Sequence, residues 1–341
     1  MADDYSYKKE MGDDSEMALH ISLDHVRFEK ESDKKLKQLS KELSIKGFRK
    51  GNVPEHVAKA HLGPRVYEET LNAILPQITS EIVAKEKLEP ITRVDYKVEK
   101  LDPKEGIEFS AKFTVFPEFK LGKISKIKVK KESAEVTDKD IQKVIDNMLE
   151  ESEKKSDDKK AKKPKLDDEW VKTLGMENIS TVDELKKVIK QTLESQKKQY
   201  TEEKYQADIL QEAVKSSKVP VPEKIIELEL DSRENDYRKR ITDLNLDVDD
   251  FLRNQKSSME ELRKEWKSDV SERVATDLLL IKIIRENGMK IEPKEVDAEI
   301  EKLEDESMKE EYSNPRAKAQ VADVMLRQKA LKWILSEVEG K

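Results

Sequence analysis

The stretch from Ile107 to Val115 reads IEFSAKFTV, and it decides the fold of the first part of the chain. Its apolar residues recur at every second position, which is the period of a half-buried β-strand. Residues 17–23 (MALHISL) alternate in the same way. A third run, which ends at the turn Asp102-Pro103-Lys104-Glu105-Gly106, is marked by Ile91, Val94, Tyr96 and Val98. Together these runs predict a small antiparallel sheet.

Helical patterns lie between these strands. After residue 23 the apolar phase shifts to Val26 and Phe28, which predicts a strand bulge near His25. A helix carrying Leu36, Leu39 and Leu43 follows, and a longer helix is expected after Gly63-Pro64. Helices inserted between antiparallel strands predict an α+β domain, whereas the polar first 15 residues predict a loose segment.

The remainder reads as helix. Residues 151–165 (ESEKKSDDKKAKKPK) predict a flexible charged linker, and from Leu166 onward every apolar pattern has helical spacing. The helix boundaries are marked by capping residues, prolines and one glycine: Thr137 with Asp140, Thr181 with Glu184, Ser258 with Glu261, Pro220, Pro222, Gly288, Pro293 and Pro315. An extended all-α part is therefore predicted after the α+β domain.

Composition narrows the class of protein. The chain has 341 residues, enough for two or three domains, and its 41% charged and 35% hydrophobic residues favour long amphipathic helices over a deep globular core. The net charge of −7 comes from mixed signs, so a general nucleic-acid coat is not expected. The start, MADDYSYKKEMGDD, does not resemble a signal peptide, and the apolar run Leu278–Ile284 is too short to span a bilayer. We expect a soluble, intracellular protein with no membrane contact.

The sequence shows no motif typical of a catalytic or metal site, and we interpret its many carboxylates as solvated faces or helix caps. There is no cysteine, which excludes disulfides and thiolate zinc sites, and the nine glycines form no phosphate-binding motif. The four histidines, His20, His25, His56 and His61, lack the spacing of a helical zinc pair, and we interpret them as ordinary surface or boundary residues. The sequence therefore predicts no metal and no cofactor.

One loop stands out between the first two helical patterns. It reads Gly47-Phe48-Arg49-Lys50-Gly51-Asn52-Val53-Pro54 and follows Lys46. Two glycines permit a sharp turn, and an exposed ring beside three cations could fill an apolar crevice while the cations meet phosphate or carboxylate. Taken alone, the segment favours an ordinary polar turn with one stray aromatic residue.

The surroundings of this loop change that weighting. The run G-F-R-K-G-x-V-P between two helices, followed by Leu62-Gly63-Pro64, resembles the ribosome-docking signature of bacterial trigger factor. Further segments that resemble this family, over most of residues 17–338, are Val66–Glu69 with Leu71–Pro76, Ile107–Pro117, Val136–Asp138, Asp167–Lys172 with Leu174-Gly175, and Val219–Pro222.

The resemblance implies a cytoplasmic, ATP-independent chaperone that docks near the exit tunnel of the large ribosomal subunit, on protein and RNA, and binds nascent or unfolded polypeptides. Its ribosome-binding residues would be Lys46, Gly47, Phe48, Arg49, Lys50 and Gly51. The expected parts are a flexible N-terminus (1–16), an α+β docking domain (17–135), a helix and charged linker (136–165) and an extended all-α chaperone domain (166–341). A homodimer stays open, and the client-binding residues are not identified.

Trigger factors usually carry an FKBP-type prolyl isomerase domain where this chain has only Glu150 to Lys165. A stretch this short cannot hold a sheet with a proline pocket, so we expect no enzymatic activity. The alternatives are a chaperone with a residual isomerase role, a prolyl isomerase chaperone of a different type, like the periplasmic ones, a helical adaptor without client activity, and an RNA-binding factor. The acidic balance and the single basic tip argue against the last.

Overall fold

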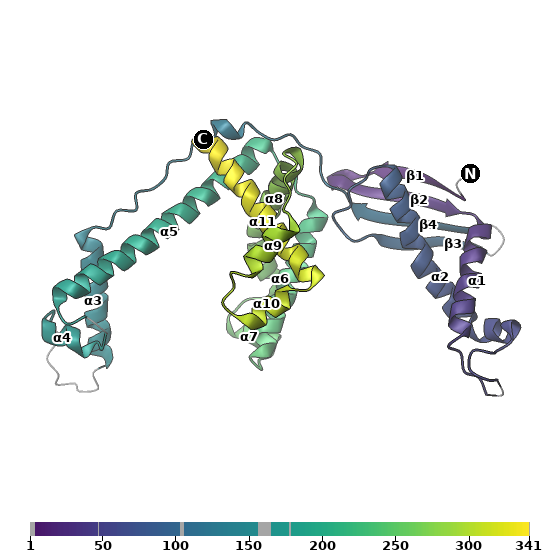
Figure 1. The fold of residues 1–341 in the computed structure, drawn as a ribbon, viewed down its shortest axis with the longest axis horizontal. Helices are drawn as coiled ribbons and strands as arrows, with labels where there is room; N and C mark the ends of the chain where they lie inside the picture. Colours follow the sequence, from purple (N-terminus) through teal and green to yellow (C-terminus); the bar gives the residue numbers. More distant parts are fainter. Residues whose placement is uncertain (1–3, 47, 103–105, 156–164, 177–178, 341) are drawn as a thin grey trace. The chain divides into compact units, whose positions relative to one another are not determined.

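The structure is a computed structural model that describes residues 4–46, 48–102, 106–155, 165–176 and 179–340 (Figure 1). The chain forms two compact units. One unit combines residues 1–120 with 218–278, and the other combines residues 121–217 with 279–341. No helix in the described ranges is both long and apolar enough to cross a membrane.

A four-stranded antiparallel sheet forms the base of the first unit. Its strands are β1 (Tyr5–Met11), β2 (Glu16–Leu23), β3 (Asp95–Asp102) and β4 (Gly106–Thr114), in the order β1-β2-β4-β3. In the register Leu19 is paired with Ala111 and Ile21 with Phe109, so the alternating apolar residues of neighbouring strands share one face. The three strands expected from the alternation are confirmed.

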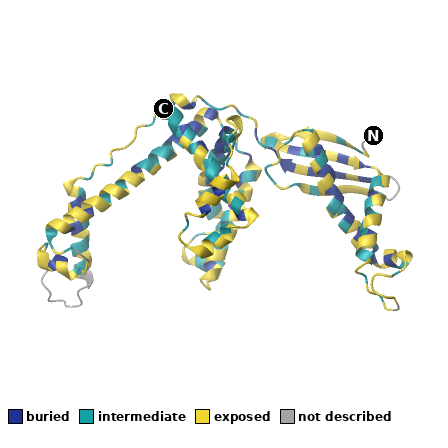
Figure 2. Ribbon diagram, in the orientation of Figure 1, coloured by how far each residue is buried: buried dark blue, intermediate teal, exposed yellow. Residues whose placement is uncertain are grey.

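Helix α2 (Glu55–Lys85) covers that apolar face (Figures 1 and 2). Ile74, Ile78 and Ile82 are fully buried against the sheet. The predicted start of a separate helix after Pro64 is wrong, because α2 runs through both Pro64 and Pro76. Both prolines are exposed, so water can bond the carbonyls that lose their helical partners, while buried residues on the other face pack α2 against α1 near Pro64 and against the sheet near Pro76.

Helix α1 (His25–Ser40) replaces the predicted bulge near His25. The Asp24 side chain accepts a hydrogen bond of 2.8 Å from the Val26 backbone N–H, which is an N-cap. Capping therefore ends the strand at Leu23 and begins a helix, and Phe28 packs into the sheet core from α1 rather than from a strand.

The prediction of a loose N-terminus over residues 1–16 is also wrong, because β1 pairs with β2 along its length. Only Tyr5 and Tyr7 of β1 contact the core, and the other residues of the strand are exposed. The Tyr7 hydroxyl donates to Glu86 at 2.5 Å, and Lys9 forms an ion pair with the same carboxylate. A charged edge strand of this kind blocks further strand pairing, and it conceals the alternation in the sequence.

The first unit also contains three helices from later in the chain: α6 (Glu223–Asp243), α7 (Val248–Asn254) and α8 (Met259–Glu286). Helix α8 belongs to this unit up to Leu278. The core of these helices includes Leu230 and Val270 and contacts Phe116 of the α+β part. The Arg263 guanidinium lies 2.7–2.8 Å from three carboxylates, Glu227, Asp231 and Glu234. The hydrogen bond to Glu234 is the main reason that the pKa of Arg263 is raised.

The second unit is helical. It contains η2 (Ile124–Lys126), α3 (Asp138–Lys155), α4 (Asp168–Thr173), α5 (Val182–Ser217), α9 (Pro293–Ile300), α10 (Glu306–Tyr312) and α11 (Pro315–Glu339). Ile145, Trp170 and Leu185 join α3, α4 and α5 in one apolar cluster. The predicted capping pairs are confirmed at Thr137 with Asp140, at Thr181 with Glu184 and, in the first unit, at Ser258 with Glu261.

The compact units differ from the predicted domains. Residues 218–278 pack with the α+β part, although the sequence assigned them to one helical domain from 166 to 341. Helix α3 continues to Lys155, so the helix overlaps the start of the predicted linker at 151–165. Most of that linker, residues 156–164, lies outside the described residues.

Candidate functional site

The loop between α1 and α2 is supported by a small apolar cluster of its own. Leu36 of α1 packs with Ala58, Leu62 and Val66 of α2, and Leu43 and Val53 close the cluster at the loop end. The two helices are therefore fixed against each other beneath the loop. A loop with a rigid base can present side chains without a large entropic cost on binding.

Backbone hydrogen bonds define the shape of the loop. The Gly51 N–H donates to the Leu43 carbonyl oxygen at 3.2 Å, and the Phe48 N–H donates to the Ile45 carbonyl oxygen at 3.0 Å. Gly51 has φ +78°, and a Cβ placed there would lie 3.0 Å from the Lys41 carbonyl oxygen. Both the backbone angle and the available space therefore require glycine at this turn.

The side chains of the loop face water. Phe48 is 41% exposed, and Lys46, Arg49 and Lys50 are exposed on the same short segment. None of these three cations forms an ion pair with another described residue. Gly47 lies outside the described residues. We call Lys46 and Phe48–Gly51 the tip loop; an aromatic ring and three unpaired cations on it suit an anionic partner with an apolar crevice.

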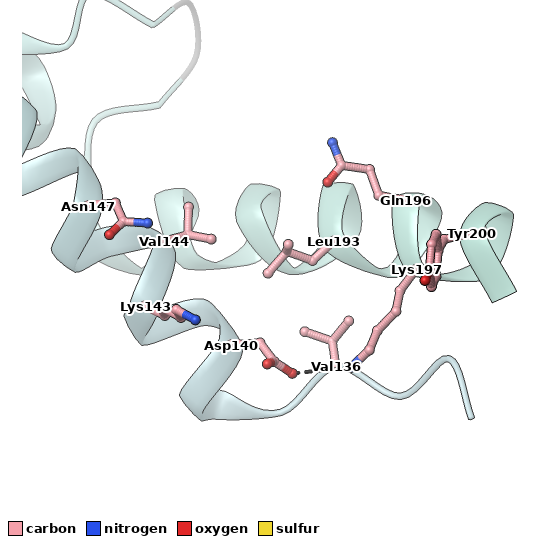
Figure 3. A pocket seen from close by; sticks show the side chains of 9 residues that line it. All are labelled: Val136, Asp140, Lys143, Val144, Asn147, Leu193, Gln196, Lys197 and Tyr200. Carbon is pink, nitrogen blue, oxygen red and sulfur yellow. Dashed lines mark hydrogen bonds and ion pairs between the residues drawn. The ribbon is translucent and has the colours of Figure 1, made fainter. Parts of the chain in front are cut away.

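A groove lies between α3 and α5 of the second unit (Figure 3). It encloses about 370 Å³ and is lined by Val136, Asp140, Lys143, Val144, Asn147, Leu193, Gln196, Lys197 and Tyr200. Its lining is mainly apolar, and Tyr200 is 61% exposed at its edge. Charged and amide side chains surround the apolar floor, which is the arrangement of a weak binding surface for mixed peptide segments.

One ion pair fixes the polar edge of this groove. The Lys197 Nζ lies 3.3 Å from Asp140 Oδ2 (Figure 3). It also donates to the Glu135 carbonyl oxygen at 2.6 Å. The backbone N–H of Thr137 is the main cause of the lowered pKa of Asp140, and the Thr137 hydroxyl and Lys197 add to it. The Asp140 carboxylate thus caps α3 and orients Lys197 at the same time.

A second apolar groove, of about 430 Å³, lies among α9, α10 and α11. Its lining residues are Glu299, Ile300, Leu303, Met308, Tyr312, Gln320, Val321, Val324, Met325 and Gln328. Val324 is 53% exposed and Met308 42% exposed. Two flexible methionine side chains beside an exposed valine can adapt to differently shaped apolar groups.

Comparison with known proteins places these features in a family. The family model for the bacterial trigger factor protein matches residues 5–148, and the model for the C-terminus of the same protein matches residues 181–336. The chain belongs to the trigger factor family. It is therefore a ribosome-associated chaperone that assists protein folding.

Individual trigger factors agree over nearly their full length. The trigger factor of Bacillus cytotoxicus is 24% identical, over 84% of this chain and 87% of the relative. That of Macrococcus caseolyticus is 25% identical, over 88% and 91%. A solved structure is also similar to this chain, with a TM-score of 0.58 and 17% sequence identity. It is described as "Promiscuous Substrate Recognition in Folding and Assembly Activities of the Trigger Factor Chaperone", and the match covers 98% of this chain and 100% of that chain.

The residues that resemble the trigger factor signature lie in the tip loop. The structure brings Lys46, Phe48, Arg49, Lys50 and Gly51 together at the end of the α1–α2 hairpin. The sequence did not identify either groove, because their lining residues are separated by up to 64 positions and become neighbours only when helices pack. Among the described residues no group of three His, Asp or Glu side chains is arranged to hold a metal ion.

Proposed function

We propose that this chaperone docks on the large ribosomal subunit beside the exit tunnel through its tip loop. Phe48 fills an apolar crevice, while Arg49 and Lys50, supported by Lys46, bond phosphate or carboxylate groups. The observation that carries the proposal is the exposure of the ring and its three unpaired cations above an internally packed hairpin. Binding to an anionic partner is favoured because none of these charges has to give up a partner among the described residues.

Ribosome co-sedimentation tests this docking. A tip variant with Phe48→Ala, Arg49→Ala and Lys50→Ala should lose most of its ribosome binding. A matched control removes an exposed apolar residue and two unpaired exposed cations from the end of α6, by Lys239→Ala, Arg240→Ala and Leu244→Ala. Undiminished sedimentation of the tip variant, or equal loss in the control, would refute the docking role.

We further infer that the two grooves bind apolar segments of unfolded polypeptides weakly and without ATP. Each groove joins an apolar floor to polar or charged edges, so a bound segment can leave once it folds and buries its own apolar groups. Val324→Glu should reduce the suppression of aggregation of a denatured model protein. The control is Leu244→Glu, at a residue 66% exposed and far from both grooves in sequence. Equal activity of both variants would exclude the α9–α11 groove.

The proposal includes no prolyl isomerase activity. The described residues between the two family matches, 149–155, 165–176 and 179–180, contribute to helices and to the apolar cluster of α3, α4 and α5. We therefore assign these residues to the packing of the helical unit and not to a pocket for proline. A proline-containing test peptide should isomerise at its spontaneous rate in the presence of the protein, and any acceleration would contradict this part of the proposal.

A further inference from the structure

A second basic surface lies far along the chain from the tip loop. Residues 121–131 read LGKISKIKVKK and contain five lysines and no carboxylate, although the whole chain carries a net charge of −7. We call residues 121–131 the lysine strap. It includes η2 and the start of the non-helical segment that leads to α3 (Figure 1). All of it belongs to the second unit.

The lysine strap is held at both ends by α5. At its start the Gly122 N–H donates to the Ser217 hydroxyl oxygen at 2.9 Å, and a Cβ on Gly122 would lie 2.7 Å from the Ser216 backbone. At its end Lys131 forms an ion pair with Glu202 and lies over the Tyr205 ring, 5.4 Å from its centroid. Ile124 is buried between these anchors, and η2 packs against α11.

Between the anchors the side chains alternate in burial. Lys126, Lys128 and Lys130 are exposed, whereas Ile127 and Val129 are half-buried. This is the period of an extended chain, in which neighbouring side chains point to opposite sides. The apolar residues thus fix the strap to the helices, and the lysines form a row that faces water.

These exposed lysines have no partner of their own. Lys123, Lys126, Lys128 and Lys130 form no ion pair with any other described residue. Two carboxylates at the end of the strap are already engaged, because Glu202 is paired with Lys131 and Glu132 with Lys204. A fixed row of uncompensated positive charge attracts an anion with repeated charges.

We propose that the lysine strap is an RNA-binding surface that contacts the phosphate backbone without regard to base sequence. Protein interfaces are enriched in aromatic residues, methionine and arginine and depleted in lysine, and residues 121–131 contain none of the three enriched types. Lysine meets phosphate as a point charge and needs no specific base edge. The inference rests on the proposed function in one respect, which is that the RNA would be that of the ribosome on which the chaperone docks.

Fluorescence anisotropy with a short labelled RNA duplex tests the assignment directly. The strap variant carries Lys126→Gln, Lys128→Gln and Lys130→Gln. Its control carries Lys172→Gln, Lys186→Gln and Lys187→Gln, which remove the same charge from exposed lysines of α4 and α5 in the same unit. Neither variant removes a buried side chain, so both should fold.

The strap substitutions should lower the slope of log affinity against log salt by about 2.7, which is about 0.9 for each of the phosphate contacts removed. Between about 50 and 200 mM salt, the wild type should therefore lose about 40-fold more affinity than the strap variant. The control should keep the wild-type slope. An unchanged slope in the strap variant, an equal change in the control, or absent RNA binding by the wild type would overturn the inference.

Two further measurements separate the partner and the two proposals. Polyglutamate should compete with labelled RNA far less well than unlabelled RNA does; equal competition would assign the surface to acidic proteins and overturn the RNA assignment. The strap substitutions should also lower the slope in the tip variant by the same amount. If the strap substitutions leave the salt slope unchanged, the strap inference is overturned but tip docking is not, because docking is measured by ribosome sedimentation. If the tip variant still sediments with ribosomes, tip docking is overturned but the anisotropy result for the strap is not.

Discussion

Replacing Gly51 by alanine tests the idea that the tip loop must keep one shape to dock. At φ +78° an alanine costs about 1–2 kcal/mol from the clash of its own Cβ. The Lys41 carbonyl oxygen, 3.0 Å from that Cβ, allows no easy relief because it belongs to the backbone. The Gly51 N–H bond to Leu43 is then strained, and the loop populates other shapes.

The strain at residue 51 weakens ribosome binding by lowering the fraction of molecules whose tip loop has the docking conformation. A penalty of about 1–2 kcal/mol lowers that fraction by up to about 5–30-fold, and the apparent Kd for ribosomes rises by the same factor. Co-sedimentation over a range of ribosome concentrations measures it. Urea denaturation of the same samples shows that the rest of the protein stays folded.

Gly63→Ala is the matched control. Gly63 lies within α2, has no positive φ, and its added Cβ would meet no atom within 4 Å. Alanine in a helix interior is better than glycine by about 0.5–1 kcal/mol, so this variant should be slightly more stable and bind ribosomes normally. If Gly51→Ala binds as tightly as Gly63→Ala, the shape of the loop is not part of docking.

Three other predictions concern the second unit. Ile145 is fully buried, so Ile145→Ala should cost about 2–5 kcal/mol in urea denaturation; an unchanged midpoint would contradict its place in the core. The lowered pKa of Asp140, caused mainly by the Thr137 N–H, means that its carboxylate contributes stability above an unfolded pKa of about 4, which is lost as the pH falls through the lower folded value. Asp140→Asn should therefore weaken the acid dependence of the urea midpoint, and identical pH profiles for variant and wild type would refute this assignment. Gly122→Ala should displace the lysine strap from Ser216 and speed tryptic cleavage after its lysines, whereas an unchanged cleavage rate would show that the close approach is not needed.

Local signals in the sequence predicted the elements that local chemistry controls. Reciprocal hydrogen bonds at Thr181 with Glu184 begin a helix wherever an apolar stripe follows, and Gly288 ends one with φ +57°. Strand β1 was not predicted, because it lies at the edge of the sheet and its charged residues hide the apolar alternation. The start of α2 was predicted wrongly at Pro64 because the cost of an interior proline is offset by packing of Leu62 and Val66 against α1, which is distant in sequence.

The candidate site divides in the same way. The tip loop is contiguous, so its glycines, ring and cations could be read together, and its resemblance to trigger factor was recognisable. The two grooves and the anchors of the lysine strap join residues that are distant in sequence. Lys131, for example, contacts Glu202 and Tyr205.

The sequence by itself determined the strands and helices with clear periods, the capped helix ends and the family, and it supplied the motif that we propose for docking. These depend on side chains within a few positions of one another. Only the tertiary structure decided that residues 218–278 pack with the α+β part, that β1 forms an edge of the sheet and that Lys131 of the strap is paired with Glu202, whereas Lys123, Lys126, Lys128 and Lys130 pair with no other described residue. Such outcomes depend on which distant surfaces exclude water and which charges meet, and chain neighbours do not fix either.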